Sequence, residues 1–197
     1  MKNERELAAI LFSDVSEFTN TMDTDENMAM DQIARHKEIV LCTLKEYNGH
    51  LIKDLGDGLF VKFSSAVASV KCAIKIQQLT KSENFSIRIG IHLGDVITKN
   101  ADVFGSGVNI ASRIHTASTP GSICISKEIW RQIKNQDDIQ SKSLGKKLFK
   151  GVDEKIEVFE LLNDKSSTLH SLNGNELYSY MKNKLFPLTG LFLTIIG

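Results

Sequence analysis

The sequence has no excess charge of either sign and few cysteines. Its 24 lysines and arginines equal its 24 aspartates and glutamates, so no overall field attracts nucleic acid or an anionic membrane, and phosphate binding must depend on local placement. The three cysteines, Cys42, Cys72 and Cys124, have neither paired nor metal-ligand spacing, which argues against a disulfide framework or a zinc site. Buried thiols in a reducing compartment are expected instead.

Targeting signals and the common nucleotide-binding motifs are also missing. The start, Met1 to Glu6, is charged and does not lead into a long apolar run, so no secretory signal is expected and the folded part is predicted to lie in the cytoplasm. Gly94, Gly105 and Gly107 do not form the fingerprint of a P-loop or a dinucleotide fold, and no GK[ST] occurs. P-loop ATPases and dehydrogenases are therefore disfavoured.

Apolar residues recur in a pattern that predicts the order strand, helix, strand, strand, helix, strand. Residues 7–12 are typical of a strand buried on both faces, which would present Ser13 and Asp14 at its end. The other core elements expected are a helix over 25–48 stopped by a left-handed cap at Gly49, strands 51–55 and 59–63 around a tight turn, a helix capped by Ser64, and an extended strand pair over 85–97. This order predicts a ferredoxin-like α+β fold, an antiparallel sheet with helices on one face.

The chain continues beyond this core. The elements expected there are a helix over 107–118, a strand over 122–126, a helix over 127–133 and a strand over 155–162, which complete a domain over 1–163. A polar linker is predicted over 164–184. The apolar residues 185–197 follow Lys182 and Lys184 and are shorter than the roughly 20 residues that cross a bilayer. They are interpreted as the start of a transmembrane helix or a surface anchor, with a helix packed on the domain or a partner as the alternative.

Two aspartates stand where one edge of the sheet would bring them together. Asp14 ends a strand, and Asp57 lies in the turn of the hairpin that a βαββ sheet places beside it. Hard cations prefer oxygen ligands, and a two-metal site both activates an attacking hydroxyl and neutralises phosphate charge, so this pair suits two magnesium ions. Taken singly, each aspartate is more often a cap or a turn residue.

Asn109 and Arg113 are four residues apart in a predicted helix, so their side chains lie on one face. A guanidinium suits the charge that grows on a phosphoryl group, and an amide can orient a ribose oxygen. The alternative is an arginine on a solvated face with an asparagine in the first turn. His92 lies in an apolar segment, which is typical of a structural rather than a catalytic histidine.

Several short motifs occur in one order along the chain. They are Phe12-Ser13-Asp14 with Phe18-Thr19, Ile52-Lys53-Asp54-Leu55-Gly56-Asp57, Arg88-Ile89-Gly90-Ile91-His92, and Asp102-Val103-Phe104-Gly105 through Val108-Asn109 to Ala111-Ser112-Arg113. Together, over about residues 7–162, they resemble the class III adenylyl and guanylyl cyclases. The resemblance implies an enzyme that forms 3′,5′-cyclic AMP and pyrophosphate from ATP by attack of the ribose 3′ hydroxyl on the α phosphate.

The resemblance also implies where metal and triphosphate bind. Two Mg²⁺ or Mn²⁺ ions per site would be held by Asp14, the backbone at Val15, and Asp57. The backbone after Asp14, in the segment with Phe18 and Thr19, would help to cradle the triphosphate. These roles follow from the family's motifs and not from spacing alone.

Two residues would read the base by the same resemblance. Lys53 would donate to a ring nitrogen of adenine, and Asp102 would accept from the exocyclic amine. Guanine needs the opposite pattern, and an unpaired buried polar group discriminates strongly, so ATP is expected over GTP. The alternative is a guanylate or dual-specificity cyclase.

The remaining roles concern the transition state and the distal phosphates. Asn109 and Arg113 match the family's ribose-orienting and phosphate-stabilising pair, while Arg88 and Lys150 match positions that bind the β and γ phosphates. Family members build each site across a dimer interface, with metals and base-reading residues on opposite subunits. Because this chain has every role, a homodimer with two equivalent sites is implied.

One residue departs from the family's pattern. Glu17 stands where many relatives have glycine, in the loop after the first metal aspartate, and a carboxylate there could crowd or repel the triphosphate. This bears on the catalytic rate more than on the substrate class. A catalytically silent nucleotide-binding dimerisation module is a further alternative, although such modules usually lose at least one of these positions.

Overall fold

Strand β1 (Glu4–Val15) runs through the middle of the sheet in a computed structural model that describes residues 4–100 and 102–162. Its segment from Ala8 to Phe12 is buried, as the apolar run predicts. The elements after β1 are α1 (Phe18–Thr24), α2 (Glu26–Glu46), β2 (His50–Asp54), β3 (Gly58–Phe63), α3 (Ala66–Thr80), β4 (Ile87–Lys99), β5 (Asp102–Phe104), α4 (Ser106–Thr116), β6 (Ile123–Ser126), α5 (Lys127–Ile133), β7 (Gln140–Leu148) and β8 (Lys155–Leu162).

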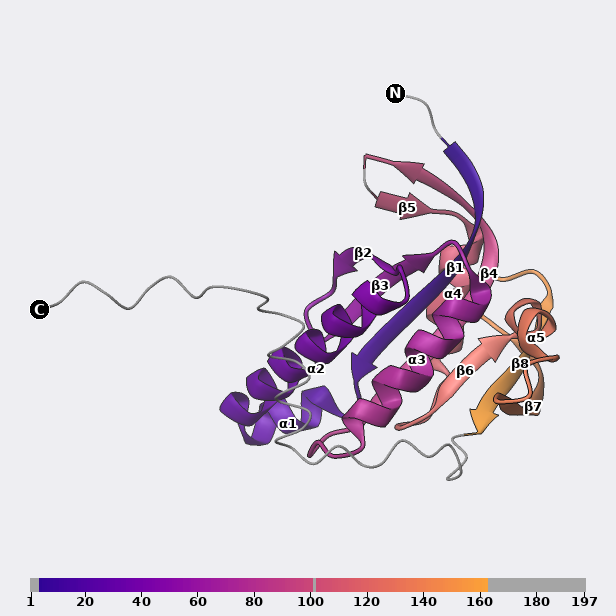
Figure 1. Ribbon diagram of the computed structural model, residues 1–197. Helices are drawn as coiled ribbons and strands as arrows, with labels where there is room; N and C mark the ends of the chain where they lie inside the picture. The colour runs from indigo at the N-terminus through magenta and orange to yellow at the C-terminus, as the bar shows by residue number, and fades with distance from the viewer. Residues whose placement is uncertain (1–3, 101, 163–197) are drawn as a thin grey trace, which may run out of the picture. The chain divides into compact units, whose positions relative to one another are not determined.

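The strands form one sheet in the order β2-β3-β1-β4-β6-β8-β7, with β5 paired to β4 (Figure 1). The order of the first four strands is that of a ferredoxin-like core, which confirms the predicted α+β fold. The pairings among the four core strands β1 to β4 are antiparallel as expected, and the parallel pair of β4 and β6 belongs to the C-terminal addition. The chain leaves β4 through β5 and α4, and this crossover allows β6 to return in the same direction.

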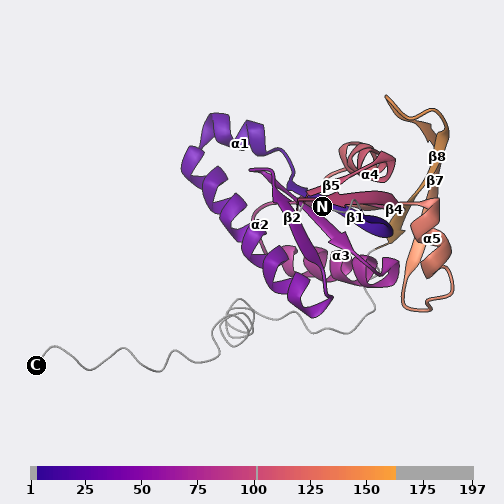
Figure 2. The ribbon, with the colours of Figure 1, turned by 90° about the horizontal axis from the view of Figure 1, so that it is seen from above.

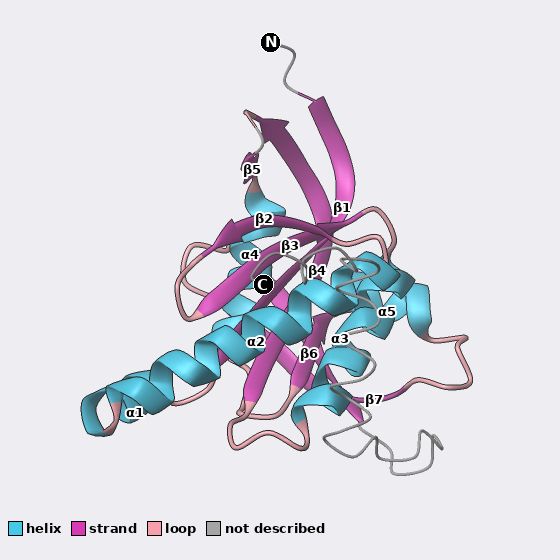
Figure 3. Cartoon of the chain, turned by 60° about the vertical axis from the view of Figure 1, so that its left-hand side comes forward, coloured by secondary structure: helices cyan, strands magenta, loops and turns pink. Residues whose placement is uncertain are grey.

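Helices cover both faces of the sheet, because the core helices α2 and α3 share one face, as expected, and α4 of the C-terminal addition lies on the other (Figure 2 and Figure 3). Figure 2 shows α4 on the opposite side of the sheet from α3, and Figure 3 shows α2 and α3 crossing the same face. Consecutive residues of β1 reflect this, since Ser13 contacts His36 of α2 and Asp14 contacts His115 of α4. Side chains alternate between the faces of a strand, so both layers act on the end of β1.

Several local predictions need correction. Residues 85–97 are not a strand pair, because β4 continues unbroken to Lys99 as the partner of the long β1. The cap of α3 is Ser65 rather than Ser64, since the Ser65 hydroxyl accepts a hydrogen bond from Ala68 N. The left-handed residue after α2 is Asn48 (φ 54°) and not Gly49. A Cβ on Gly49 would lie 2.6 Å from side-chain atoms of Leu44 and Phe63, so packing requires this glycine.

Three short or polar elements were not predicted. They are α1, β5 and β7. Strand β7 is mostly exposed and has no apolar alternation; it exists because its backbone pairs with β8 at the edge of the sheet. The predicted linker over 164–184 and the apolar tail over 185–197 lie outside the described residues. No helix within 4–100 and 102–162 is both long enough and apolar enough to cross a membrane.

Candidate active site

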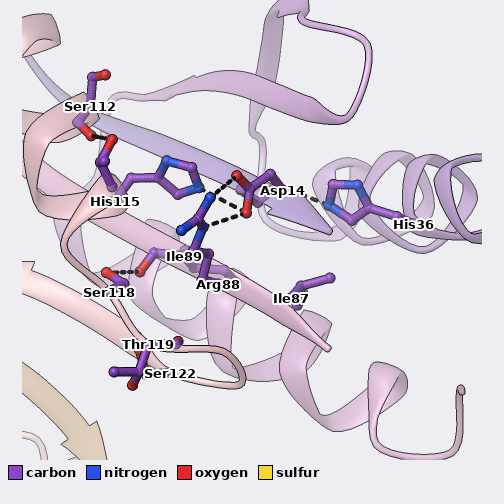
Figure 4. Close-up of polar contacts among 12 residues, drawn as sticks. Asp14, His36, Ile87, Arg88, Ile89, Ser112, His115, Ser118, Thr119 and Ser122 are labelled. Carbon is purple, nitrogen blue, oxygen red and sulfur yellow. Dashed lines mark hydrogen bonds and ion pairs between the residues drawn. The ribbon is translucent and has the colours of Figure 1, made fainter. Parts of the chain in front are cut away.

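Asp14 lies near the end of β1 between two strands that supply its neighbours. It is opposite Gly58 of β3 and opposite Arg88 of β4 in the strand register. Arg88 donates two hydrogen bonds to its carboxylate, from Nε to Oδ1 at 2.8 Å and from Nη2 to Oδ2 at 2.9 Å. His115 Nε2 of α4 lies 3.3 Å from Oδ1, without the alignment of a hydrogen bond (Figure 4).

These contacts keep Asp14 ionised although it is buried. Burial alone would raise the pKa of Asp14, but His115 and Arg88 outweigh it and lower the pKa below its ordinary value. The pKa of Arg88 is raised, chiefly by its hydrogen bonds to Asp14 and further by the charge of Asp57. The Arg88 guanidinium therefore binds the Asp14 carboxylate directly and also lies in the field of the Asp57 carboxylate.

The β2–β3 turn holds Asp57 beside Asp14. Val15 N donates to the carbonyl of Asp57 at 3.2 Å, which ties the turn to the end of β1. Within the turn, Gly56 N donates to Asp54 Oδ1 at 2.9 Å, and Lys37 Nζ lies 2.7 Å from Asp54 Oδ2. The hairpin prediction is thus confirmed, and helix α2 supports the turn from outside.

Gly58 permits this close approach of the two strands. A Cβ on Gly58 would lie 2.7 Å from the carbonyl oxygen of Ser13. Any other residue would push the turn, and with it Asp57, away from Asp14. The predicted pairing of the two aspartates at one sheet edge therefore depends on a glycine next to Asp57.

The donor set fits a small divalent cation. Asp14 supplies a carboxylate from the end of β1 and Asp57 one from the β2–β3 turn, and Ser16, just beyond Val15, has a buried hydroxyl with no hydrogen-bond partner within the described residues. Within the described residues no three His, Cys, Asp or Glu side chains gather as a self-sufficient metal site. Mg²⁺ is usually bound by one or two carboxylates plus substrate phosphates, so this sparse set matches a metal that arrives with a nucleotide.

The two predicted base-reading residues lie together. Lys53 of β2 and Asp102 of β5 form an ion pair with Nζ 3.5 Å from Oδ2. They are far apart in the sequence and meet because β5 folds back along β4 toward β2. An amine donor and a carboxylate acceptor are thereby presented side by side, partly exposed.

Asn109 and Arg113 are exposed on α4 and do not reach Asp14. His115, which does contact Asp14, is two residues after Arg113, so the two side chains point roughly 200° apart around the helix axis. The helix is pressed onto β4, since a Cβ on Gly90 would lie 2.3 Å from His115 N. The predicted transition-state pair therefore faces away from the predicted metal-binding aspartates of its own chain.

The remaining predicted residues lie on the periphery. Lys150 is exposed in the connection between β7 and β8, and Phe18 and Thr19 begin the short helix α1. Within the described residues, Lys150 forms no hydrogen bond or ion pair with Arg88, its predicted partner in phosphate binding. Two hollows of about 480 Å³ lie between α1, α2 and the segment 83–86, and neither is lined by Asp14, Asp57, Lys53 or Arg113.

Glu17 has a backbone conformation that explains why glycine suits its position. Its φ of 61° and ψ of 18° are left-handed, which costs a non-glycine residue about 1 kcal/mol. Its carbonyl accepts from Thr21 N at 3.1 Å, in the first turn of α1. The side chain is exposed, next to the loop that follows Asp14.

Two histidines near the site were missed by the sequence reasoning. His115 follows the Arg113 motif but carries no signal of its own, and His36 lies in the middle of α2. His36 Nε2 contacts the Ser13 hydroxyl at 3.1 Å, and burial lowers the pKa of His36 to about 4, so it is neutral at pH 7. His92 is buried, with Nδ1 2.9 Å from the Ser126 hydroxyl, and has the structural setting expected for it.

Comparison with known proteins places the chain in a family. Residues 1–163 match the family described as Adenylate and Guanylate cyclase catalytic domain. Putative adenylate cyclase 3 of Rhizobium meliloti is 32% identical over 164 residues, which cover 79% of this chain and 28% of that protein. Adenylate cyclase of Mycosarcoma maydis is 26% identical over 157 residues, 64% of this chain and 6% of that protein. The chain thus spans less than a third of these curated relatives.

Solved structures of cyclase domains share the fold of this chain. An adenylate/guanylate cyclase/hydrolase from Silicibacter pomeroyi superposes with a TM-score of 0.77 at 28% identity, covering 83% of this chain and 100% of that one. The adenylyl cyclase CyaB from P. aeruginosa shares the fold with a TM-score of 0.75 at 23% identity, covering 84% and 98%. The chain belongs to the family of adenylate and guanylate cyclase catalytic domains.

Proposed function

We propose that this cyclase domain converts ATP to 3′,5′-cyclic AMP and pyrophosphate. The observation that carries the preference for ATP is the Lys53–Asp102 pair, which places a donor and an acceptor side by side at 3.5 Å. Adenine offers the complementary ring nitrogen and exocyclic amine. GTP would leave both charged groups without the partners they need, and such mismatches are strongly rejected.

The reaction is an in-line displacement at the α phosphate. Asp14, Asp57 and the backbone at Val15 would hold Mg²⁺ or Mn²⁺, which would neutralise phosphate charge and lower the pKa of the attacking 3′ hydroxyl. Asn109 orients the ribose, and Arg113 stabilises the charge that develops on the phosphoryl oxygens. Arg88 and Lys150 hold the departing pyrophosphate, with the backbone near Phe18 and Thr19 closing around it.

The active form is proposed to be a homodimer with shared sites. Arg113 points away from Asp14 of its own chain because α4 presents His115 to the carboxylate, so Arg113 serves a metal site on another subunit. The two hollows described above are lined by neither Asp14 nor Arg113. A small-molecule site normally buries most of its ligand, and a second subunit would provide that enclosure.

A direct assay tests the proposal. The purified chain with Mn²⁺ or Mg²⁺ is expected to form cyclic AMP from ATP, and to turn over GTP at most about a hundredth as efficiently. The Asp57→Ala chain is the inactive control. Equal use of GTP would favour the alternative, a guanylate or dual-specificity cyclase. Absence of any cyclic nucleotide at concentrations that include dimer would favour the silent binding module.

Two substitutions at Glu17 test whether its carboxylate repels the triphosphate of bound ATP. Glu17→Gln removes the carboxylate and is expected to lower the KM for ATP about threefold, the scale of one screened surface charge. Glu17→Gly removes the same charge and also the left-handed strain, so it should match Gln in KM and differ in unfolding midpoint. If Glu17→Gln leaves KM unchanged, the side chain does not face the triphosphate.

A further inference from the structure

Both oxygens of the Asp14 carboxylate have partners within the chain. Oδ1 contacts Arg88 Nε at 2.8 Å and His115 Nε2 at 3.3 Å, and Oδ2 accepts from Arg88 Nη2 at 2.9 Å. The Asp14 side chain is only 11% exposed. A cation that binds this carboxylate therefore comes close to the Arg88 guanidinium and competes with it for the same two oxygens.

The two partners differ in how firmly they are held. His115 is fixed by its backbone, because α4 touches Gly90 of β4 at that residue, and its side chain is 12% exposed. The Arg88 side chain is 32% exposed, and its hydrogen bonds within the described residues go to Asp14. A guanidinium that binds a carboxylate through two nitrogens can bind a phosphate in the same way. Arg88 is thus the partner that can move.

We propose that Arg88 is a gate on the metal site: it occupies Asp14 in the nucleotide-free chain and leaves it for the triphosphate, while His115 remains and positions the carboxylate for the metal. This rests on the proposed function, which assigns Asp14 to the metal and Arg88 to the triphosphate. A metal alone must compete with Arg88, whereas a triphosphate removes the competitor. Metal and nucleotide therefore favour each other's binding, and the coupling is reciprocal.

If Arg88 competes with the metal for Asp14, replacing Arg88 should raise the affinity for metal, whereas replacing a residue that binds the metal would lower it. In nucleotide-free protein, titrated with Mn²⁺ and followed by electron paramagnetic resonance, Arg88→Gln is expected to bind Mn²⁺ about tenfold more tightly than wild type. Arg88→Lys keeps the charge but loses the two-point contact, and should give a smaller rise. Lys37→Gln is the matched control, because it removes a cation bound to Asp54 near the turn but not to Asp14, and should leave Mn²⁺ affinity unchanged.

His115 is tested in the same titration. His115→Leu should weaken Mn²⁺ binding about tenfold, as loss of a group that orients a metal ligand does. His115→Gln, whose amide can still donate to Asp14, should recover most of that affinity. A merely structural role for His115 would lower the unfolding midpoint of both variants without separating their Mn²⁺ affinities.

The outcomes separate this inference from the proposed function. Measurable Mn²⁺ binding by wild type, with no gain in Arg88→Gln and Arg88→Lys, overturns the gate and leaves the metal site standing. An equal gain in Lys37→Gln also overturns it, since bulk charge would then be the cause. Absence of Mn²⁺ binding in wild type and every Arg88 variant overturns the gate, and the metal site itself is overturned only if wild type also forms no cyclic nucleotide from ATP with Mn²⁺.

Discussion

Mixing Asp57→Ala and Arg113→Ala chains is expected to restore cyclic AMP formation that neither chain shows alone. Each substitution should reduce the rate at least about a hundredfold, because one removes a metal ligand and the other the cation that stabilises the transition state. In a mixed dimer, one site combines both defects and the other is intact. Random pairing should therefore return roughly a quarter of the wild-type activity.

The geometry of α4 makes this rescue specific. Arg113 faces away from Asp14 of its own chain, and Lys53 pairs with Asp102 just before α4, so Lys53 and Arg113 contribute to the same half of a site. Mixing Lys53→Ala with Arg113→Ala should consequently give no rescue. Differently tagged chains, purified in tandem, would verify that mixed dimers form. If such dimers of Asp57→Ala and Arg113→Ala stay inactive, the sites are not shared.

Gly90→Ala is expected to be the most damaging single-methyl change in the described core. The added Cβ would lie 2.3 Å from His115 N and 2.4 Å from His115 Cα, both backbone atoms that cannot rotate away. Helix α4 would have to move off β4, at a cost of about 3 kcal/mol in the free energy of unfolding. The same shift would withdraw His115 from Asp14 and displace Arg113, so cyclase activity should fall as well.

A second glycine provides the control. Gly145 has a φ of 77° and nothing within 4 Å of an added Cβ, so Gly145→Ala should cost only the left-handed strain, about 1 kcal/mol. Urea unfolding of both variants measures the difference. A Gly90→Ala chain no less stable than Gly145→Ala would show that α4 can relax from the sheet, against the packing argument.

Local patterns were sufficient for the elements that carry the metal-binding aspartates. The apolar run before Asp14 predicted the centre of β1, which extends three residues further at each end, and the Gly56-Asp57-Gly58 turn predicted the β2–β3 hairpin to within one residue of its observed bounds. They succeeded because burial and turn chemistry act within a few residues. Strand β7 was not predicted, because its residues are polar and mostly exposed and carry no local strand pattern. It is a strand only because it pairs with β8.

The sequence by itself determined the kind of chemistry, the family and the α+β order, because motif residue types and apolar periodicity are local properties. Only the tertiary structure decided which of those residues meet. It placed Arg88 on Asp14 through strand register, joined Lys53 to Asp102 across 49 positions of sequence, and turned Arg113 away from the aspartates by seating His115 against Gly90. Those contacts depend on the packing of distant segments, which no local pattern encodes.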